Sequence, residues 1–543
     1  MFYLILLFTI LFFFLAWRRL DWAVMLAVAA MPAYLIRFNI LGLPSTLLEV
    51  MIWAVFLVWG ITNWTRIKEN LREACKKNSD KIKIRYPFDW EIILLLLVAF
   101  AAAGVAGFNT SSLGVWKAYF FEPAMLFVVA LNVIKGEKGR EKIIWALAVS
   151  ALAVSALAIY QKITGQLIDN PLWAAEATRR VVSFFGYPNA VGLYLGPLVL
   201  VFTGWLMSAI MSINEVISQS KKNPKLQALN PRQITSTKSQ TKTKNLFGNW
   251  DLGFDWKLSG FVSLRKRSGE TTTRSGVARG FGIWNFQTIF IGLTIISSTL
   301  AIYFAKSKGA LMGVVAGLIV FGLLAGKKIR WATVAIVLLT AASLLAYQPA
   351  RKLALDTITF KTLSGQIRLA GWQDSWTILK DGRLLTGAGL ANFQAAVTPY
   401  HTEGIFIKDF SDPDAQRKLV FNEAYRTAHW QPLEIYLYPH NIILNFWSEL
   451  GLAGVLLFIW IIGKFLVIGL WDLFGNWKLE IGNLETQKNK FIIIGSLSAM
   501  TAIIVHGLVD VPYFKNDLAV MFWLFIAMMS LINLEIKYGK NNL

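Results

Sequence analysis

The sequence predicts an all-α polytopic integral membrane protein with about 12–13 transmembrane helices and one large extracytoplasmic loop. Hydrophobic residues make up 55% of the 543 residues, and the mean hydropathy is +0.51, which is too apolar for an ordinary soluble domain. Apolar runs of roughly 17–25 residues recur along the chain, each long enough to cross a bilayer. Basic residues concentrate in alternate connections, as in cytoplasmic loops.

The apolar runs define the predicted spans. They fall near 2–17, 22–36, 45–62, 91–107, 117–134, 143–160, 189–213, 285–305, 309–325, 331–347, 441–463, 491–509 and 517–535. The first run has no basic residue before it, and Arg18 and Arg19 follow it. A cleaved signal peptide has the opposite order of charge. We therefore expect a retained first helix with its N-terminus outside.

The charge of the connections supports this alternation. Residues 63–90 hold eight Lys or Arg against four Asp or Glu, and residues 214–284 hold thirteen against four. Residues 348–438, which then lie outside, are nearly balanced at ten against nine. The net charge of +22 is thus explained by topology, and we expect no nucleic-acid partner.

The chain divides into five predicted regions: N-terminal transmembrane helices (1–213), a basic and disordered cytoplasmic insertion (214–284), further transmembrane helices (285–347), a folded extracytoplasmic cap (348–440) and C-terminal transmembrane helices (441–543). Within the cap, DSWTILKDG predicts a short amphipathic helix closed by a turn. One cysteine, Cys75, excludes an internal disulfide and a CxxC metal site. Four scattered histidines give no zinc motif, so we expect neither a metal nor another cofactor.

The segment YPHNIILNFWSELGLAG (438–454) places polar groups in an apolar helix. At 100° per residue, Gly451 and Gly454 lie below His440 and predict close approach of another helix. Asn441 and Glu449 belong to a second, polar stripe that should face the protein interior, because lipid cannot satisfy it. His440 itself fits two roles, a cap at the helix start or a general base.

Cations on the expected outer side extend the hypothesis. Arg179 and Arg180 precede a helix that starts near Asn189, and Lys306 and Lys308 form an outer turn. Lys117, Arg368 and His506 belong to the same set. Trp372 accompanies Arg368, and Asp510 accompanies His506. Each cation alone could be an ordinary surface ion pair. Together they suit a phosphate-bearing ligand, because Arg offers forked hydrogen bonds to phosphate oxygens.

These residue types predict glycan transfer from a lipid-linked donor. Arginine would offset the charge that develops on a leaving diphosphate. A neutral histidine would take a proton from the attacking hydroxyl, because its pKa lies near the operating pH. The donor's lipid would lie in the bilayer and its sugar in the cap.

Four stretches together resemble the O-antigen ligase and polymerase superfamily of bacterial membrane glycosyltransferases. They are RRVVSFFGYPNAVGLYL, SGQIRLAGWQDSWTILKDGRLLTGAGLANF, HNIILNFWSELGLAG and HGLVDVPYFKNDLAVMFW, spanning roughly Arg179 to Trp523. The resemblance implies a GT-C-like fold and metal-independent transfer of a glycan from an undecaprenyl-diphosphate carrier to a hydroxyl of a glycan, lipid or protein. It places the protein in the bacterial inner membrane, with the active site facing the periplasm.

By this resemblance, His440 corresponds to the histidine that activates the acceptor, and Arg180 and Arg368 to essential arginines. Asp510 matches an acidic position late in the chain. Lys306 and Lys308 stand where the family more often has Ser-Arg, so the charge is kept without the fork. The basic insertion is not a general family feature.

Ligase, repeat-unit polymerase and protein O-oligosaccharyltransferase remain open as alternatives, since the acceptor is not legible in the sequence. The rival from another class is a transporter or flippase of an anionic lipid-linked glycan. Transporters often show internal repeats and polar breaks at mid-membrane. This sequence shows no repeat between its halves, and its polar residues cluster at the outer rim, which favours an enzyme.

Overall fold

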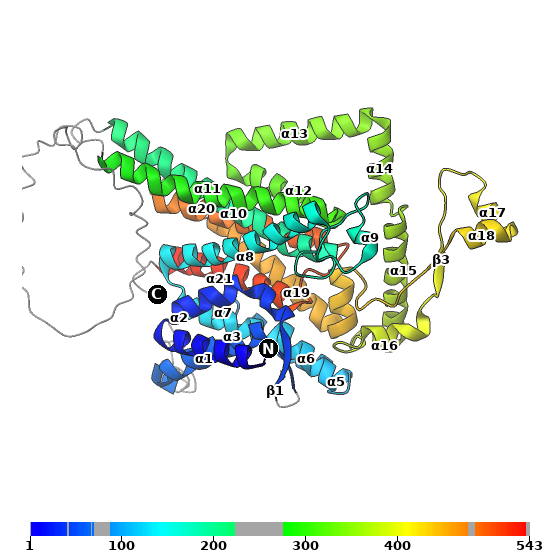
Figure 1. Cartoon of the computed structure of the whole chain (residues 1–543), viewed down its shortest axis with the longest axis horizontal. Coiled ribbons are helices and arrows are strands. Elements are labelled where there is room, and N and C mark those ends of the chain that lie inside the picture. The colour runs from blue at the N-terminus through cyan, green and yellow to red at the C-terminus, as the bar shows by residue number, and fades with distance from the viewer. Residues whose placement is uncertain are drawn as a thin grey trace, which may run out of the picture.

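The structure, a computed structural model, describes residues 2–40, 43–66, 68–69, 87–222, 275–475 and 484–538. These residues form an all-α membrane protein with two short antiparallel strand pairs, so the predicted fold class is confirmed. Most helices run along the long axis of the molecule as one bundle, and a smaller layer of short elements covers one end of it (Figure 1).

The bundle contains most of the helices. They are α1 (Phe2–Arg18), α2 (Leu20–Ala29), α3 (Leu47–Thr62), α5 (Asp89–Val105), α6 (Thr110–Trp116), α7 (Glu122–Val133), α8 (Gly136–Thr164), α10 (Pro188–Lys222), α11 (Ser275–Ala305), α12 (Lys308–Ala325), α13 (Lys327–Ala346), α19 (Ile442–Phe474), α20 (Leu484–Gly507) and α21 (Asn516–Tyr538). A π-helical turn (Lys117–Phe121) joins α6 to α7, and the short α9 (Pro171–Ala174) precedes α10. Strands β1 (Arg37–Ile40) and β2 (Leu43–Thr46) pair antiparallel before α3.

In the described residues, nine helices are long and apolar enough to cross a membrane. Helices α1, α2 and α3 are apolar but shorter, and α5 has 17 residues. The span predicted at 22–36 is wrong as a single membrane helix. Helix α2 has only 10 residues, about 15 Å at 1.5 Å per residue, and a 3₁₀ turn (Met31–Leu35) containing Pro32 follows it.

The centre of the bundle is α21, whose side chains are almost all buried. Glycines bring other helices of the bundle together. A Cβ added at Gly204 of α10 would lie 2.4 Å from the carbonyl oxygen of Phe491 in α20, and one at Gly313 of α12 would lie 2.8 Å from that of Ala502. Close backbone contact of this kind is how membrane helices gain packing energy without a hydrophobic drive.

Residues 348–440 form the cap over one end of the bundle. The cap contains α14 (Gln348–Ile358), α15 (Leu363–Ile378), a π-helical turn (Leu379–Arg383), α16 (Phe393–Val397), a 3₁₀ turn (Thr398–Tyr400), β3 (Gly404–Phe406), α17 (Ala415–Phe421), α18 (Glu423–Ala428) and β4 (Trp430–Pro432). Strand β3 pairs antiparallel with β4. The helix predicted at DSWTILKDG is the last part of the longer α15, which Thr362 caps by accepting from the backbone N–H of Gly365.

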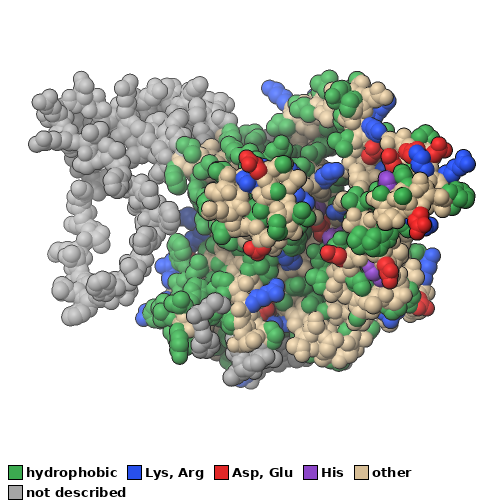
Figure 2. All heavy atoms as spheres, turned by 45° about the vertical axis from the view of Figure 1, so that its right-hand side comes forward, with side chains coloured by type: hydrophobic (Ala, Val, Ile, Leu, Met, Phe, Trp, Pro, Cys, Tyr) green, Lys and Arg blue, Asp and Glu red, His purple; other side chains and the backbone are tan. Residues whose placement is uncertain are grey.

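The ends of the bundle differ in charge. Helices α8 and α11 end at the cap, and α10, α12, α19 and α21 begin there, so the basic connections 135–142 and 327–330 lie at the opposite end (Figure 1). Hydrophobic side chains dominate the flank of the helices, and basic, acidic and histidine side chains gather at the cap end (Figure 2). The predicted disordered insertion falls mainly on 223–274, outside the described residues.

A buried ion pair joins three helices at the end away from the cap. Arg140 of α8 donates to the carboxylate of Glu535 in α21 and, over 3.0 Å, to Oδ1 of Asn489 in α20. The Arg140 and Glu535 side chains are 1% and 5% exposed. Two charges so far from water are stable only as a pair.

We expect Arg140→Ala to lower the free energy of unfolding by about 3–5 kcal/mol, because Glu535 would be left as an unpaired buried charge. The double variant R140M/E535M should recover most of the loss. Lys142→Met, which breaks an exposed 2.9 Å pair with Asp21, should cost less than about 1 kcal/mol. Thermal unfolding of the purified proteins in detergent measures all three. Equal losses in R140A and K142M would contradict this interpretation.

Candidate functional site

His440 lies at the end of an extended segment, Leu433–Pro439, that runs from β4 to α19. Its backbone has a φ of +50°, which is uncommon for a residue other than glycine. The cap of α19 is Asn441, whose Oδ1 accepts from the backbone N–H groups of Ile443 and Leu444, both at 3.0 Å. The first hypothesis for His440, a helix cap, is therefore wrong, and its side chain is available for another role.

Asp510 faces the ring of His440. Its Oδ1 lies 3.6 Å from Nδ1 of His440 and accepts a 2.9 Å hydrogen bond from the backbone N–H of Val511. The Asp510 carboxylate is 1% exposed, whereas the His440 side chain is 21% exposed. A carboxylate on the Nδ1 side directs the other ring nitrogen, Nε2, away from it. Tyr436 and Tyr438 hold the ring edge-on, at centroid distances of 5.0 and 5.2 Å.

The Asp510 carboxyl is ionised despite its burial. Burial raises its pKa, but the contact with His440, the nearby His506 and the backbone amide of Val511 outweigh burial and lower the pKa to about 2. Its negative charge is therefore present at any physiological pH and is available to stabilise a protonated His440.

Arg180 reaches this pair through Asn189. The Nδ2 group of Asn189 donates to Oδ2 of Asp510 over 3.2 Å, and Arg180 Nη2 donates to Oδ1 of Asn189 over 3.4 Å. Arg180 Nε also donates to the carbonyl oxygen of Ala305 over 3.0 Å. This contact places Arg180 beside the turn of Lys306 and Lys308, whose side chains are exposed. Burial lowers the pKa of Arg180.

Arg368 approaches from the cap. Its Nε donates to the carbonyl oxygen of Val509 over 2.8 Å, and its Nη1 donates to Ser364. Burial lowers its pKa, while Asp510 and Tyr436 raise it. His506, near the end of α20, is buried against Gly309. A Cβ added at Gly309 would lie 2.7 Å from its ring. Asn441 joins the group by donating to the carbonyl oxygen of Leu508 over 3.1 Å.

Three of the predicted site residues have other partners. Lys117 forms a 2.9 Å ion pair with Glu49 of α3. Arg179 donates to the carbonyl oxygens of Ala174 and Lys162 over 3.1 and 3.0 Å. Trp372 packs edge-on against Phe360 at 5.0 Å, within the cap. These contacts do not bring the three side chains to His440.

Glu449 is buried, as predicted for the polar stripe, but the two glycines do not bring another helix close. Helix α19 breaks at Gly451, which has φ +72° and ψ −171°. The close neighbour at the break is a loop of the cap and not another helix, because an added Cβ would lie 2.2 Å from the carbonyl oxygen of Leu385. Gly454 faces Leu450 of its own helix. The buried Glu449 accepts from the backbone N–H of Ala391 in the same loop.

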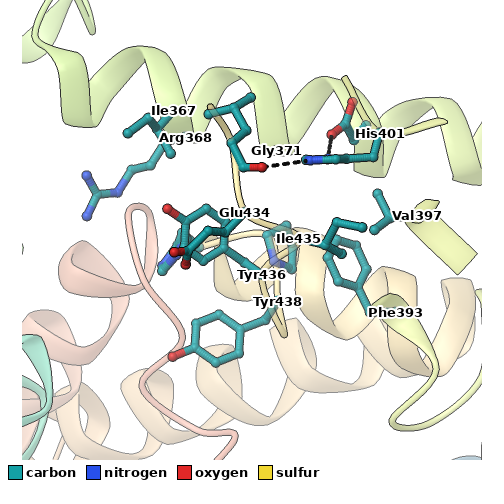
Figure 3. A pocket seen from close by; sticks show the side chains of 14 residues that line it. Ile367, Arg368, Gly371, Phe393, Val397, His401, Glu434, Ile435, Tyr436 and Tyr438 are labelled. Atoms are coloured by element: carbon teal, nitrogen blue, oxygen red, sulfur yellow. Dashed lines mark hydrogen bonds and ion pairs between the residues drawn. The ribbon is translucent and has the colours of Figure 1, made fainter. Parts of the chain in front are cut away.

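A small pocket opens beside His440, with a cavity volume of about 20 Å³. It lies between α15 and the segment 433–440, and Figure 3 shows Tyr436 and Tyr438 at one end and His401 at the other. Arg368 points from its edge toward the loop before α21 (Figure 3). Glu434, Asp374 and Phe393 also line the pocket.

Sequence reasoning missed most of this lining. Tyr436 and Tyr438 stand two residues apart before His440, and the period of an extended chain places both on one side, so this spacing is a usable signal. The pairing of Asp374 with His401 had none, because 27 residues separate them. Lys515 was not among the predicted site residues: its Nζ lies 4.8 Å from the ring centre of Tyr187 and 4.9 Å from that of Phe185.

In the described ranges, no group of three or more His, Cys, Asp or Glu side chains could hold a metal ion. What the arrangement does offer is a histidine oriented by a carboxylate, two partly buried arginines and an adjoining pocket. In such a site the histidine could remove a proton from a hydroxyl, and the arginines could bind an anion beside it.

The break in α19 gives a stability test. An alanine at Gly451 would meet Leu385 and would also need a positive φ, so we expect Gly451→Ala to cost at least about 1–3 kcal/mol. Gly463→Ala is the matched control in the same helix, because no atom lies within 4 Å of its added Cβ. Thermal unfolding in detergent compares the two, and equal midpoints would contradict the assigned role of the break.

Residues 293–459 match the family described as O-antigen ligase. The match includes Lys306, Lys308, Arg368 and His440, and it stops before Asp510. No curated protein matches the chain.

Proposed function

The chain is a multi-pass membrane protein with an O-antigen ligase domain at residues 293–459, and we propose that it transfers a glycan from an undecaprenyl-diphosphate carrier to an acceptor hydroxyl. The observation that carries this proposal is the contact chain from Arg180 through Asn189 and Asp510 to His440. It joins an anion-binding group to a base at one end of the bundle.

His440 acts as the general base. Its Nε2 takes the proton of the acceptor hydroxyl as the oxygen attacks the anomeric carbon of the donor sugar. Asp510 holds the ring through the Nδ1 side and stabilises the imidazolium that forms. The new bond joins the acceptor oxygen to the anomeric carbon, the bond from that carbon to the phosphate oxygen breaks, and the lipid diphosphate leaves with the electron pair.

Arg180 and Arg368 bind the diphosphate, with Lys306 and Lys308 at the rim. Arg180 donates to a backbone carbonyl oxygen and to a side-chain amide oxygen. Because neither is a carboxylate, its positive charge is not neutralised by an ion pair and can act on the leaving group. The acceptor hydroxyl approaches His440 from the side of this pocket, between α15 and the segment 433–440.

The active site faces the periplasm in this proposal. The basic connections 135–142 and 327–330 lie at the bundle end away from His440, and cytoplasmic loops attract such residues. The protein then lies in the inner membrane, and the carrier lipid reaches the site from the outer leaflet.

We expect His440→Ala to lower the transfer rate by about 10²–10⁴-fold, the usual contribution of a general base. The variant should insert in membranes and unfold at the wild-type temperature. Transfer is measured with purified protein, a defined lipid-linked donor and candidate acceptors, and the product identifies ligation or polymerisation. His429→Ala, a histidine stacked on Tyr425 in the cap, is the control. Wild-type turnover in H440A would overturn the role of the base.

Arg180→Lys should reduce transfer by at least about tenfold, because lysine keeps the charge but loses the fork that reaches both Ala305 and Asn189. Arg179→Lys is the neighbouring control, since the contacts of Arg179 are to backbone carbonyl oxygens away from Asp510. Rates at saturating acceptor and varied donor separate binding from turnover. An R180K enzyme as active as R179K would mean that Arg180 acts only as a surface charge.

A further inference from the structure

A second histidine–carboxylate pair lines the pocket at the end away from His440. His401, after the 3₁₀ turn at Thr398–Tyr400, places Nδ1 3.4 Å from Oδ2 of Asp374 in α15. Its Nε2 lies 3.2 Å from the carbonyl oxygen of Leu433. The two side chains are 13% and 11% exposed, and Figure 3 shows both contacts on the ring.

The chemistry of these partners requires a proton between His401 and Asp374. The Leu433 carbonyl can only accept, so Nε2 must carry a hydrogen. A neutral ring would then present a lone pair from Nδ1 to a carboxylate, which is repulsive. The geometry is satisfied when one further proton lies between Nδ1 and Oδ2, either as imidazolium with carboxylate or as imidazole with carboxylic acid.

This bridge holds the segment that carries His440. Leu433 begins the seven-residue segment that ends at Pro439, which we call the strap. A second cap side chain fixes it, since Gln394 Nε2 donates to the carbonyl oxygen of Ile435 over 2.9 Å. Tyr436 and Tyr438 of the strap pack against the His440 ring. The positive φ of His440 is also kept only because its surroundings fix it.

We infer that His401 and Asp374 are a positioning pair, which keeps the strap and therefore His440 in place only while they share a proton. This inference rests on the proposed function, with His440 as the base. Transfer then falls at high pH for a reason separate from the base itself. The falling limb of the pH profile comes from loss of the shared proton.

The surroundings of the pair are compatible with this assignment. The other titratable groups that line the pocket are Arg368 of α15, and Glu434, Tyr436, Tyr438 and His440 of the strap and its end. Burial raises the pKa of Asp374, and the contact with His401 lowers it, with a net rise. A raised pKa means that the folded pair holds its proton to a higher pH than a free carboxyl would, and that the bridge is lost as the pH rises.

Asp374→Asn is the decisive variant. Its amide N–H can donate to Nδ1 of a neutral His401 at every pH, so the bridge no longer needs a titrating proton. His401→Ala removes the bridge. Gln394→Ala is the matched control, because it removes another hydrogen bond between the cap and the strap without removing a titratable group.

The experiment measures kcat and KM of the full chain in nanodiscs from about pH 5 to about pH 10 and follows the falling limb. We expect the falling limb of D374N to move up by at least about one pH unit. H401A should lose up to about 10²-fold in kcat, the scale of a catalytic group misplaced by about 1 Å. Q394A should lower kcat without moving the falling limb. A D374N profile that coincides with the wild type, or a limb that moves equally in Q394A, would overturn the inference.

Hydrogen exchange of the peptide 431–441 tests the bridge without any turnover. Exchange rates are corrected for the intrinsic effect of pH and compared with a peptide from α19. Exchange should rise in H401A at every pH and in the wild type at high pH, but not in D374N. The exchange result tests the bridge even if no acceptor is glycosylated. In that case the proposed reaction is wrong, and the inference about the bridge is judged by exchange alone. Unchanged exchange in H401A would overturn the positioning role.

Discussion

The site depends on one buried carboxylate, that of Asp510. A charge with 1% exposure is costly in a protein interior unless several groups compensate it. Here the compensating groups come from three parts of the chain: Val511 beside it, Asn189 at the start of α10 and His440 at the end of the strap. Asp510 therefore connects the bundle with the cap at the place where the chemistry is proposed.

The cap keeps its position through a second device, the break in α19. At Gly451 the helix opens its backbone to the loop that follows α15. The N–H of Ala388 donates to the carbonyl oxygen of Ser448 over 2.6 Å, and that of Leu452 donates to Leu385 over 3.1 Å. The broken helix thus satisfies its backbone groups with the cap rather than within itself, which is how irregular backbone is tolerated beside a membrane.

The two ends of the bundle treat charge differently. Away from the cap, Arg140 is neutralised by Glu535 in a closed pair. At the cap, Arg180 and Arg368 contact carbonyl and amide oxygens, so their positive charge remains available to an anion from outside. A buried ion pair holds helices together, whereas an arginine that contacts only neutral acceptors can still bind an anion. This contrast supports placing the diphosphate at the cap end.

The sequence alone determined the membrane fold and the identity of the central residues. Apolar length and basic loops predict nearly every helix, and the motifs around Arg180, Arg368, His440 and Asp510 name four groups that the tertiary structure brings together. The sequence did not determine that Asn441 caps α19, that Gly451 breaks this helix, or that α2 is too short to cross a bilayer. Nor did it reveal the pairing of Asp374 with His401. These features depend on which backbone groups meet across long separations, and periodicity within one segment carries no information about its distant partner. Local pattern decides which residues are helical and apolar, and only packing decides which polar groups share a proton or a charge.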